Sequence, residues 1–369
     1  MYVVNWGAYI MRILHVSEAL ATGVMDMLAT YSLRQVQQGA NVVIMFTCRR
    51  DTPSDAELGS IFDERVTLCR VGFPGTSKLK SLILLRAALR RELRTEDYDA
   101  IHLHSSFAGG IGRIGLGRKE CRDRIFYSPH AFSFLREDSS NLGRRIFLGL
   151  ERLGSRVGSL ILTSESELQV AKEYLPKAQC SLVPNAINTS LLPTTKGSRR
   201  VRPIVAMAGR ITYQKAPWKF AKIAAELDYL ADFVWIGDGA QRDKEKWLAG
   251  APVQISGWLT LASLRQKLAG TDVLLFPTLW EGGALALIEA QAIGVPAVAS
   301  RIAGNRDTVV DGRSGYLCDT EDELLRRTKE LILSPETRSK MNSYALDVIR
   351  SKFDDEHVGE KLLQIYGRA

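Results

Sequence analysis

The sequence predicts an α/β protein made of two doubly wound units, each a parallel sheet with helices on both faces. Short apolar runs alternate with helical patterns twice along the 369 residues, first from Met11 and again from Ile204. A polar, basic stretch without apolar periodicity, TTKGSRRVRP at 194–203, separates the two series as a linker. Strands that alternate with helices form parallel sheets through right-handed crossovers. We therefore expect domains at 11–195 and 200–350, facing each other across a cleft at the carboxyl ends of their strands.

The apolar runs predict the strands in order, because runs of this length between turn residues are typical of buried strands. In the first domain they are RILHVS (12–17), NVVIMFT (41–47), DAIHLHS (99–105), RIFYSPH (124–130), SLILTSE (159–165) and CSLVPNA (180–186). In the second they are IVAMAGR (204–210), DFVWIGD (232–238), VQISGW (253–258), VLLFPT (273–278), PAVAS (296–300) and GYLCD (315–319). The helical patterns between them include 25–39, 82–93, 141–157 and 284–292.

The composition favours a soluble protein of a reducing compartment. Hydrophobic residues make up 46% of the chain and charged residues 24%, as in ordinary globular domains. No apolar run approaches the roughly 18 residues of a membrane span, and MYVVNWGAYI at 1–10 lacks the features of a signal peptide. Five cysteines without a C-x-x-C pair argue against a disulfide framework or a zinc site. We expect a cytoplasmic protein in which residues 1–10 are an extension ahead of a second start at Met11.

The formal charge of +8 lies in the first domain. Residues 1–200 hold 27 lysines and arginines against 19 acidic residues, whereas residues 201–369 hold 22 of each. The first domain is therefore the one that we expect to meet an anionic surface or substrate. We expect no nucleic acid among the partners.

One motif, GIGRIG at 110–115, matches the dinucleotide-binding fingerprint G-x-G-x-x-G. The fingerprint also requires an acidic residue about 20 positions further on, at the end of the next strand. The next strand here ends in YSPHAF, without a carboxylate. We interpret the glycines as turning and packing residues and keep an NAD-dependent oxidoreductase only as a lesser alternative.

Two patterns in the first domain could bind a metal ion. DYD at 97–99 offers two carboxylates, but it precedes a strand, where Asp97 and Asp99 more naturally end the preceding helix. His102 and His104 alternate along one strand and point to one face, which suits either a metal or a buried histidine pair. We favour the interpretations without metal and expect neither a metal site nor a cofactor.

The second domain carries cations and glycines in its first two loops. AMAGRITYQKAPWKF brings Arg210 off a strand end and Lys215 to the start of the next helix. A guanidinium, an ammonium and free backbone N–H groups suit a diphosphate, although two such cations alone are most often solvated surface charges. Gly237 and Gly239 follow the next strand and let a ligand approach the backbone closely.

The segment LWEGGALALIEA at 279–290 places two carboxylates around small and aliphatic residues. Glu281 falls just before a helix and Glu289 eight positions later, which predicts nearly the same helical face. Carboxylates bind sugar hydroxyls in charge-assisted hydrogen bonds. The backbone N–H groups that open the helix can receive a phosphate; they belong to Gly283, Ala284 and Leu285. The alternative is a capping acid followed by a solvated helix acid.

Taken together, GRITYQK, GDG, GWL, DVLLFPTLWEGGALALIEAQAIGVPAVAS and VVDGRSGYLCD resemble the retaining GT-B glycosyltransferases of family four, also called glycosyl transferases group 1. RILHVSEALATGV, IHLHS, SPHAFSF, TSESE and VPNAIN resemble the other domain of that family in the same order. The resemblance begins at residue 11 and implies a GT-B fold of two Rossmann-like domains facing across a cleft. It also implies that 351–369 forms a helix that returns to the N-terminal domain.

The resemblance implies a nucleotide-sugar donor held mainly by the second domain. Glu281 would contact the transferred sugar and Glu289 the ribose of the nucleoside. Arg210 and Lys215 would bind the diphosphate, with help from the glycine loop at Gly237.

The same resemblance assigns further contacts. Main chain near Trp258 and Leu259 would touch the base. His130 would lie near the sugar from across the cleft, and Gly23 would let the first loop approach phosphate and acceptor. The family commonly has Gly-Phe-Gly after the first glutamate where this chain has Gly-Gly-Ala, so Gly283 would widen the donor-sugar pocket.

The implied activity is the transfer of a hexose from a UDP- or GDP-sugar to a glycan or lipid-linked acceptor, with retention of anomeric configuration and without metal. Bacterial envelope, lipopolysaccharide or exopolysaccharide assembly would be its setting. Fixed positive groups would stabilise the departing diphosphate. The expected catalytic residues are His130, Glu281, Arg210 and Lys215. A catalytically silent sugar-nucleotide-binding subunit is the alternative, against which these intact residues argue.

The stretch TSKLKSLILLRAALRREL at 76–93 predicts a basic amphipathic helix. Its leucines fall within a sector of about 80° at about 100° per residue, with cations along the edge. These residues are Leu82, Leu85, Leu89 and Leu93, with Lys78, Arg86 and Arg90. Such a helix suits an anionic membrane surface, but a domain helix with its apolar face in the core has the same pattern. We expect peripheral binding to the inner face of the cytoplasmic membrane.

Overall fold

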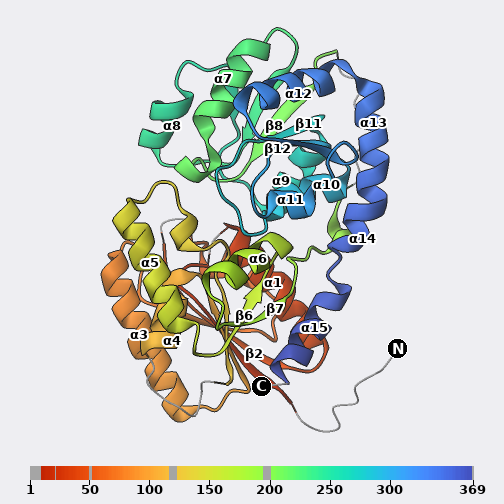
Figure 1. Cartoon of the computed structure of the whole chain (residues 1–369). Coiled ribbons are helices and arrows are strands. Elements are labelled where there is room, and N and C mark those ends of the chain that lie inside the picture. The colour runs from red at the N-terminus through yellow and green to blue at the C-terminus, as the bar shows by residue number, and fades with distance from the viewer. Residues whose placement is uncertain (1–9, 21, 50–51, 116–122, 194–200, 368–369) are drawn as a thin grey trace. The chain divides into compact units, whose positions relative to one another are not determined.

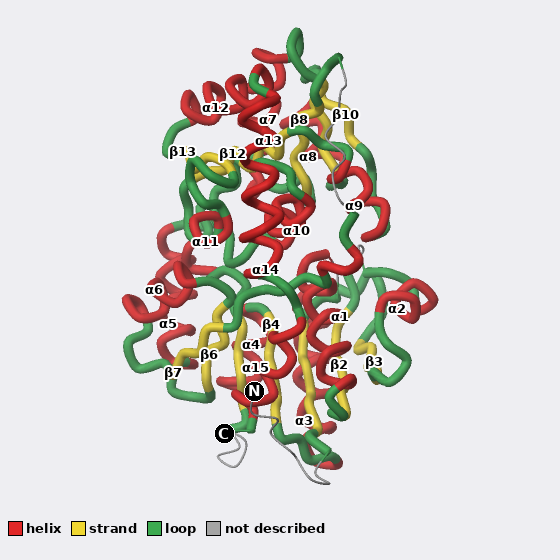
Figure 2. The backbone as a smooth tube through the Cα atoms, turned by 90° about the vertical axis from the view of Figure 1, so that its right-hand side faces the viewer, coloured by secondary structure: helices red, strands yellow, loops and turns green. Residues whose placement is uncertain are grey.

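The computed structural model describes residues 10–20, 22–49, 52–115, 123–193 and 201–367. The chain forms two compact units, of which the first comprises Met1–Phe134, Asn141–Ala186 and Asp355–Ala369. The second comprises Leu135–Ser140 and Ile187–Asp354. Each unit contains a parallel sheet with helices on both faces, as Figures 1 and 2 show for each unit taken by itself. The doubly wound architecture of both units agrees with the fold class that the sequence predicts.

The sheet of the first unit contains seven strands among the described residues, in the order β3-β2-β1-β4-β5-β6-β7. They are β1 (Arg12–Ser17), β2 (Asn41–Thr47), β3 (Thr67–Val71), β4 (Ala100–His104), β5 (Ile125–Ser128), β6 (Ser159–Leu162) and β7 (Gln179–Leu182). The helices are α1 (Thr22–Gln37), α2 (Asp55–Ile61), α3 (Lys78–Thr95), α4 (Ser106–Gly115), α5 (Asn141–Gly154), α6 (Glu165–Tyr174) and α15 (Glu356–Tyr366). A short η2 spans Ser133–Leu135. The direction of winding reverses between β1 and β4, which makes their carboxyl ends the topological switch point of the unit.

The sheet of the second unit has the order β10-β9-β8-β11-β12-β13. Its strands are β8 (Ile204–Ala208), β9 (Asp232–Ile236), β10 (Val253–Ile255), β11 (Val273–Phe276), β12 (Ala297–Ser300) and β13 (Gly315–Cys318). The longer helices are α7 (Pro217–Leu227), α8 (Gln241–Leu248), α9 (Leu261–Ala269), α10 (Leu285–Ile293), α12 (Glu321–Leu333) and α13 (Pro335–Tyr344). Shorter helical pieces are η3 (Thr189–Leu191), η4 (Tyr213–Lys215), α11 (Asn305–Thr308), η5 (Ala345–Ile349) and α14 (Arg350–Lys352). Here the winding reverses between β8 and β11.

The strands form where the apolar runs predict them, and β1 and β2 begin and end at the predicted residues. The edge strand β3 was not predicted, because TLCRV is short and none of its residues is buried. Helix α1 begins at Thr22 rather than at position 25, so Gly23 lies in its first turn and not in the loop before it. Helix α15 belongs to the first unit and packs on α1, where Arg34 forms an ion pair of 2.6 Å with Asp355.

The unit boundaries fall at Ile187 and Asp355, eight residues before the sequence-based boundary of 195 and four residues after that of 351. Most of the predicted linker, residues 194–200, lies outside the described residues. Four cysteines are free thiols, namely Cys48, Cys69, Cys180 and Cys318. The fifth, Cys121, lies outside the described part of the chain.

The membrane-facing interpretation of α3 is wrong for its leucine sector. Leu85, Leu89 and Leu93 are buried and Leu82 is partly buried, because this face of the helix packs on β2 and β3 of the sheet. Lys78, one of the cations expected to face a membrane, has its ammonium over the ring of Phe107, 3.5 Å from the ring centroid. Periodicity of this kind predicts that a helix has an apolar face, not what covers that face.

The motif GIGRIG lies inside α4 and therefore lacks the strand–turn–helix setting of a dinucleotide site. Gly112 of the motif and Gly109 just before it allow close packing instead. A Cβ built on Gly112 would lie 2.3 Å from Cδ1 of Leu103 on β4. One on the preceding Gly109 would lie 2.3 Å from Cε2 of Tyr127, a fully buried ring on β5. The absence of side chains at these positions sets how closely α4 approaches the sheet.

We predict that Gly109→Ala destabilises the first unit by about 1–3 kcal/mol, the usual cost of overpacking a close-packed core. Gly110→Ala is the matched control in the same helix, because a Cβ there meets nothing within 4 Å. It should be neutral or stabilise by up to about 1 kcal/mol through helix propensity. Urea-induced unfolding followed by circular dichroism measures both, and equal stability of the two variants would contradict the packing argument.

Candidate active site

The loops after β8 and β11 are tied together at the switch point of the second unit. The backbone N–H of Leu279 donates to the carbonyl of Gln214 at 2.9 Å, and Gln214 Nε2 donates to the carbonyl of Trp280 at 2.7 Å. Lys215 Nζ then binds Glu281 Oε1 at 2.7 Å. Because β8 and β11 are adjacent parallel strands, these three links join the two loops where ligands bind in doubly wound sheets.

The Lys215–Glu281 ion pair is largely shielded from solvent. The side chains are only 15% and 8% exposed, and the ammonium lies 4.8 Å from the centroid of the Phe276 ring. Gly209 leaves room for the lysine, since a Cβ built there would come 3.2 Å from Lys215 Cε. Removing one partner of a buried pair leaves an uncompensated charge, which is strongly unfavourable. Lys215 and Glu281 therefore hold each other in place.

Glycines line the same edge of the sheet. A Cβ on Gly237, whose φ is +136°, would lie 2.3 Å from the carbonyl oxygen of Gly209. A Cβ on Gly304 would lie 2.8 Å from the carbonyl oxygen of Gly282, in the loop that carries Glu281. Helix α10 begins beside this loop without a side-chain cap, with Ala284 at the N-cap position. Backbone thus forms much of the surface around the ion pair.

The two glutamates do not share a helical face, contrary to the sequence-based expectation. Glu281 lies in the loop before α10, whereas Glu289 lies in its middle and is buried. Glu289 Oε1 accepts from Arg265 Nε on α9 at 2.9 Å. Burial raises the pKa of Glu289, and the charge of Arg265 opposes that shift. Arg265 was not predicted, because an arginine in an amphipathic helix gives no signal of a partner 24 residues away.

The other donor-site residues predicted in the second unit lie beyond the carboxyl ends of β8, β9, β10 and β11. Arg210, Gly237, Gly283 and Leu285 are partly buried, and Ala284 is buried. Leu259 packs against the core of the unit, while Trp258 beyond β10 is exposed. Lys215 and Glu281 are in contact, whereas Glu289 pairs with Arg265.

The first unit contains four clustered histidines, three of which are hydrogen-bonded to one another. His130, expected near the sugar, follows β5 and has a left-handed φ of 52°. Its Nε2 lies 3.1 Å from Nδ1 of His104, and the His104 Nε2 lies 3.0 Å from Nδ1 of His15. His102 bonds to Tyr366 and Ser128 instead, at 2.7 and 2.9 Å.

His15, His102 and His104 place ligand atoms within 4.8 Å of one another. Both ring nitrogens of His102 and of His104 nevertheless have hydrogen-bond partners within the protein. Burial, with the neighbouring imidazoles, lowers the pKa of His102 and His104 well below the ordinary value. Neutral imidazoles that bond to one another or to Tyr366 and Ser128 account for these contacts.

The carboxylates of the DYD motif also have partners in the fold. Asp97 pairs with Arg124 at 2.7 Å, and Asp99 Oδ2 accepts from the backbone N–H of Arg12 at 2.7 Å. These contacts tie the segment before β4 to the start of β1 and to the residue before β5. They give both aspartates a structural role.

Comparison with known proteins identifies the chain. The family Glycosyltransferase Family 4 matches residues 22–191, and Glycosyl transferases group 1 matches residues 193–348. The chain belongs to the group 1 glycosyltransferases. The solved structure of sucrose-phosphate synthase from Thermosynechococcus elongatus matches with a TM-score of 0.82 at 16% identity, over 97% of this chain and 98% of that one. The predicted GT-B fold is thereby confirmed.

Several relatives of this glycosyltransferase have assigned activities, and two of them name different donors. The UDP-Gal:alpha-D-GlcNAc-diphosphoundecaprenol alpha-1,3-galactosyltransferase of Escherichia coli is 28% identical over 298 residues, which cover 73% of this chain and 75% of that one. The GDP-mannose-dependent alpha-mannosyltransferase of Mycolicibacterium smegmatis is 28% identical over 284 residues, covering 73% and 74%. The relatives thus differ in both nucleotide and sugar.

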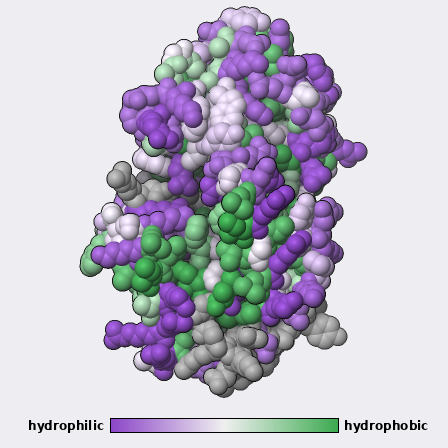
Figure 3. All heavy atoms as spheres, turned by 60° about the vertical axis from the view of Figure 1, so that its left-hand side comes forward, coloured by the Kyte–Doolittle hydropathy of each residue, from purple (hydrophilic) through white to green (hydrophobic). Residues whose placement is uncertain are grey.

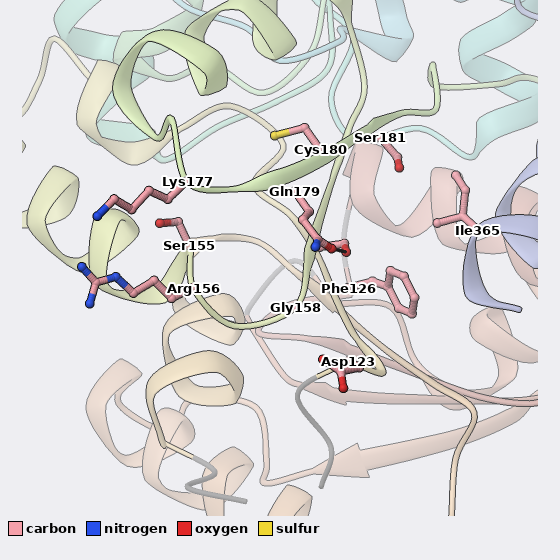
Figure 4. A pocket seen from close by; sticks show the side chains of 11 residues that line it. Asp123, Phe126, Ser155, Arg156, Gly158, Lys177, Gln179, Cys180, Ser181 and Ile365 are labelled. Carbon is pink, nitrogen blue, oxygen red and sulfur yellow. Dashed lines mark hydrogen bonds between the residues drawn. The ribbon is translucent and has the colours of Figure 1, made fainter. Parts of the chain in front are cut away.

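A cavity of about 530 Å³ lies in the first unit, at the amino ends of the strands and so opposite the β1/β4 switch point. Figure 4 shows Asp123, Arg156, Lys177 and Gln179 among its lining residues. They stand at the amino ends of β5, β6 and β7 or in the turns before them. Ligands of doubly wound sheets bind at the carboxyl ends, and none of the predicted donor-site or catalytic residues lines this cavity.

The outer surface of α3, α4 and α5 exposes apolar side chains, visible as a green area in Figure 3. Those of α5, called here the α5 stripe, are Leu142, Ile146, Leu150 and Leu153. Leu79 and Ile83 of α3 and Ile114 of α4 are exposed as well. Helix α4 packs against both α3 and α5. None of the helices in the described residues combines the length and apolar character needed to cross a membrane.

We predict that acid destabilises the first unit through its buried histidines. Burial lowers the pKa of His15 from 6.5 to about 4. Between these values the unfolded chain binds more protons, so the free energy of unfolding falls as the pH decreases from about 6.5 to about 4. The contribution of His15 is up to about 3 kcal/mol.

Urea unfolding at pH 7.5 and 4.5 measures this loss of stability. His15→Gln should lower stability at pH 7.5 but lose less of it on acidification. His357→Gln, on the exposed surface of α15, is the control and should keep the wild-type pH dependence. An unchanged pH dependence in His15→Gln would show that His15 is not the titrating group.

Proposed function

We propose that this glycosyltransferase transfers a hexose from a UDP- or GDP-sugar to a glycan or lipid-linked acceptor, with retained anomeric configuration, in envelope polysaccharide assembly. The observation that carries the proposal is the shielded Lys215–Glu281 pair at the switch point of the second unit. The E. coli relative, named for a UDP-galactose donor and a diphosphoundecaprenol-linked acceptor, supports the substrate classes.

The proposed chemistry follows from the charge that develops during transfer. The bond between sugar C1 and the diphosphate oxygen breaks, and the acceptor hydroxyl oxygen bonds to C1 from the same face. The hydroxyl proton passes to the departing diphosphate. Lys215, Arg210 and the N–H groups that open α10 stabilise the negative charge of that diphosphate.

Glu281 has two tasks in this proposal. Its carboxylate accepts hydroxyl hydrogens of the transferred sugar, and the same group holds Lys215 in place at 2.7 Å. Glu289 accepts from the ribose while its other bond holds Arg265. Truncating Glu289 would leave Arg265 buried and unpaired, so Glu289→Ala would reduce stability as well as donor affinity. Glu289→Gln is therefore the more informative variant.

We predict that Lys215→Ala lowers kcat by about 10²–10³, the usual loss when one fixed transition-state donor is removed. Lys222→Ala is the matched control. Lys222 lies on α7 of the same unit and forms an exposed ion pair of 2.7 Å with Glu321. It should retain wild-type turnover. Release of UDP or GDP from a panel of nucleotide sugars measures both. Full turnover in a folded Lys215→Ala would exclude the diphosphate role, and no turnover by wild type with any donor would favour a silent binding subunit.

We propose that neither a metal nor another cofactor takes part, because side-chain cations and backbone N–H groups can neutralise the diphosphate. Transfer by the wild-type enzyme should then continue at an unchanged rate in the presence of EDTA. Loss of transfer that Mg²⁺ or Mn²⁺ restores would contradict this.

We propose that the enzyme docks on an anionic lipid surface through the α5 stripe. The four apolar side chains fall within a sector of about 80° at about 100° per residue. Arg145 and Arg152 lie along one edge of that sector, Arg145 exposed and Arg152 bonded to the carbonyl of Tyr174 at 3.1 Å. An apolar stripe beside cations suits insertion at the boundary of headgroups and acyl chains, and the first domain carries the chain's excess of positive charge.

We predict that the double variant Ile146→Glu, Leu150→Glu abolishes flotation with vesicles that contain anionic lipid. Leu333→Glu is the control, since Leu333 is equally exposed but lies on α12 of the second unit. Arg145→Gln should weaken flotation most at low salt, where surface charges are least screened. Flotation of the double variant to the wild-type extent would exclude the α5 stripe. Concentration-dependent dimerisation without flotation would instead favour a second copy of the chain as its partner.

A further inference from the structure

A continuous chain of hydrogen bonds connects Gln35 on α1 with His130. His15 Nε2 lies 2.9 Å from Gln35 Oε1, and His15 Nδ1 lies 3.0 Å from His104 Nε2. His104 Nδ1 lies 3.1 Å from His130 Nε2. Gln35, His15 and His104 have no solvent-exposed surface, while His130 at the outer end is partly exposed. The chain therefore runs from the core beneath the β1/β4 switch point to its rim.

The chain has a direction because its inner end can only accept. The carbonyl oxygen of Gln35 has no hydrogen to give, so His15 Nε2 is the donor. Burial lowers the pKa of His15 to about 4, so at neutral pH this ring carries one hydrogen and its Nδ1 accepts. His104 Nε2 is then the donor to it, and the neutral His104 accepts at Nδ1. His130 must donate from Nε2, which leaves its Nδ1 as an acceptor.

Hydrogen bonds fix the backbone next to His130 as well as its imidazole ring. His130 and Ala131 have positive φ values of 52° and 85°, a conformation that costs free energy in residues other than glycine. The N–H of Ala131 donates to Oε1 of the buried Glu167 at 3.0 Å. Glu167 Oε2 also accepts from the N–H and the hydroxyl of Thr163, at 2.9 and 3.0 Å. The imidazole chain fixes the ring of His130, and Glu167 fixes its place on the backbone.

The remaining titratable groups around the chain form a side branch. His102 packs beside His104 with ring centroids 4.1 Å apart. Ser128 Oγ donates to the carbonyl of Ile161 at 2.7 Å and so accepts from His102 Nε2. The Tyr366 hydroxyl then donates to His102 Nδ1. Tyr31, one turn before Gln35 on α1, is buried and adds to the effect of burial in raising the pKa of Tyr366, but it is not hydrogen-bonded into the branch. This branch fixes the tautomer of His102 without passing through His130.

We propose that Gln35 is a positioning residue that, through His15 and His104, fixes His130 as the Nε2–H tautomer and presents its Nδ1 as an acceptor for a hydroxyl hydrogen of the sugar substrate. The assignment of a sugar to His130 rests on the proposed function. The tautomer itself does not, because it follows from contacts inside the first unit alone.

Long-range ¹H–¹⁵N correlation spectra of ¹⁵N-histidine-labelled full-length enzyme test the proposal. The signals of residue 130 are assigned by their loss in His130→Gln. In wild type His130 should be the Nε2–H tautomer. Gln35→Met, which removes the acceptor at similar volume, should give a mixture of the two tautomers of His130. Ser128→Ala removes a comparable buried acceptor from His102 and should leave His130 unchanged.

Kinetics separate positioning from a structural effect. Gln35→Met should lower kcat by at least about tenfold, within the range expected for misplacing a proton-handling group. The KM for the donor should stay within about twofold, and Ser128→Ala should retain wild-type kcat. Where Gln35→Met does not fold, Gln35→Asn, which withdraws the acceptor by one methylene, takes its place.

Three results would overturn the proposal. They are an Nδ1–H tautomer of His130 in wild type, a tautomer that does not respond to loss of the Gln35 acceptor, or a changed tautomer with unchanged kcat. Absence of any sugar transfer by wild type would refute the proposed function and, with it, the substrate role given to His130. The tautomer measurement would still decide whether Gln35 fixes the ring.

Discussion

The proposed donor site depends on the link between the loops after β8 and β11. In an open parallel sheet these loops diverge at the switch point, and nothing in the sheet hydrogen bonding holds them together. Here Gln214 binds the backbone of Leu279 and Trp280, and Lys215 binds Glu281 in surroundings with little solvent. The same contact places a cation, a carboxylate and an uncapped helix N-terminus within one edge of the second unit. A diphosphate joined to a sugar needs that combination of groups.

Much of the fold could be predicted from the sequence, because its signals are local. The apolar runs RILHVS and NVVIMFT define β1 and β2 to the residue, and the E-x7-E segment lies in the predicted strand–loop–helix setting. Local signals fail where the environment decides. Helices α3 and α5 both carry an apolar stripe beside arginines, yet Leu85, Leu89 and Leu93 of α3 cover the sheet, whereas the α5 stripe faces outward. The glycines of GIGRIG match a binding motif, but they lie in a helix that packs closely on β4.

The pairings within the candidate sites could not be predicted, because each joins residues far apart in the chain. Lys215 and Glu281 are 66 positions apart, and His15 and His104 are 89 apart. The sequence identifies Glu289 as a candidate but contains no pattern that points to Arg265. It likewise places His102 and His104 on one face of a strand. It does not show that His104 belongs to the hydrogen-bond chain that ends at His130, or that His102 belongs to the side branch. Strand register alone does not give these pairings either, because His15 lies opposite His102 and yet bonds to His104.

The claim that Lys215 and Glu281 act as one unit is tested most directly by a double-mutant cycle on kcat/KM. The variants are Lys215→Met, Glu281→Gln and the two together, assayed with the donor that supports the fastest transfer. Residues that act as a unit give strongly non-additive losses. We predict that the double variant is about as slow as the slower single variant. Losses that multiply, so that each residue contributes independently of the other, would contradict the account.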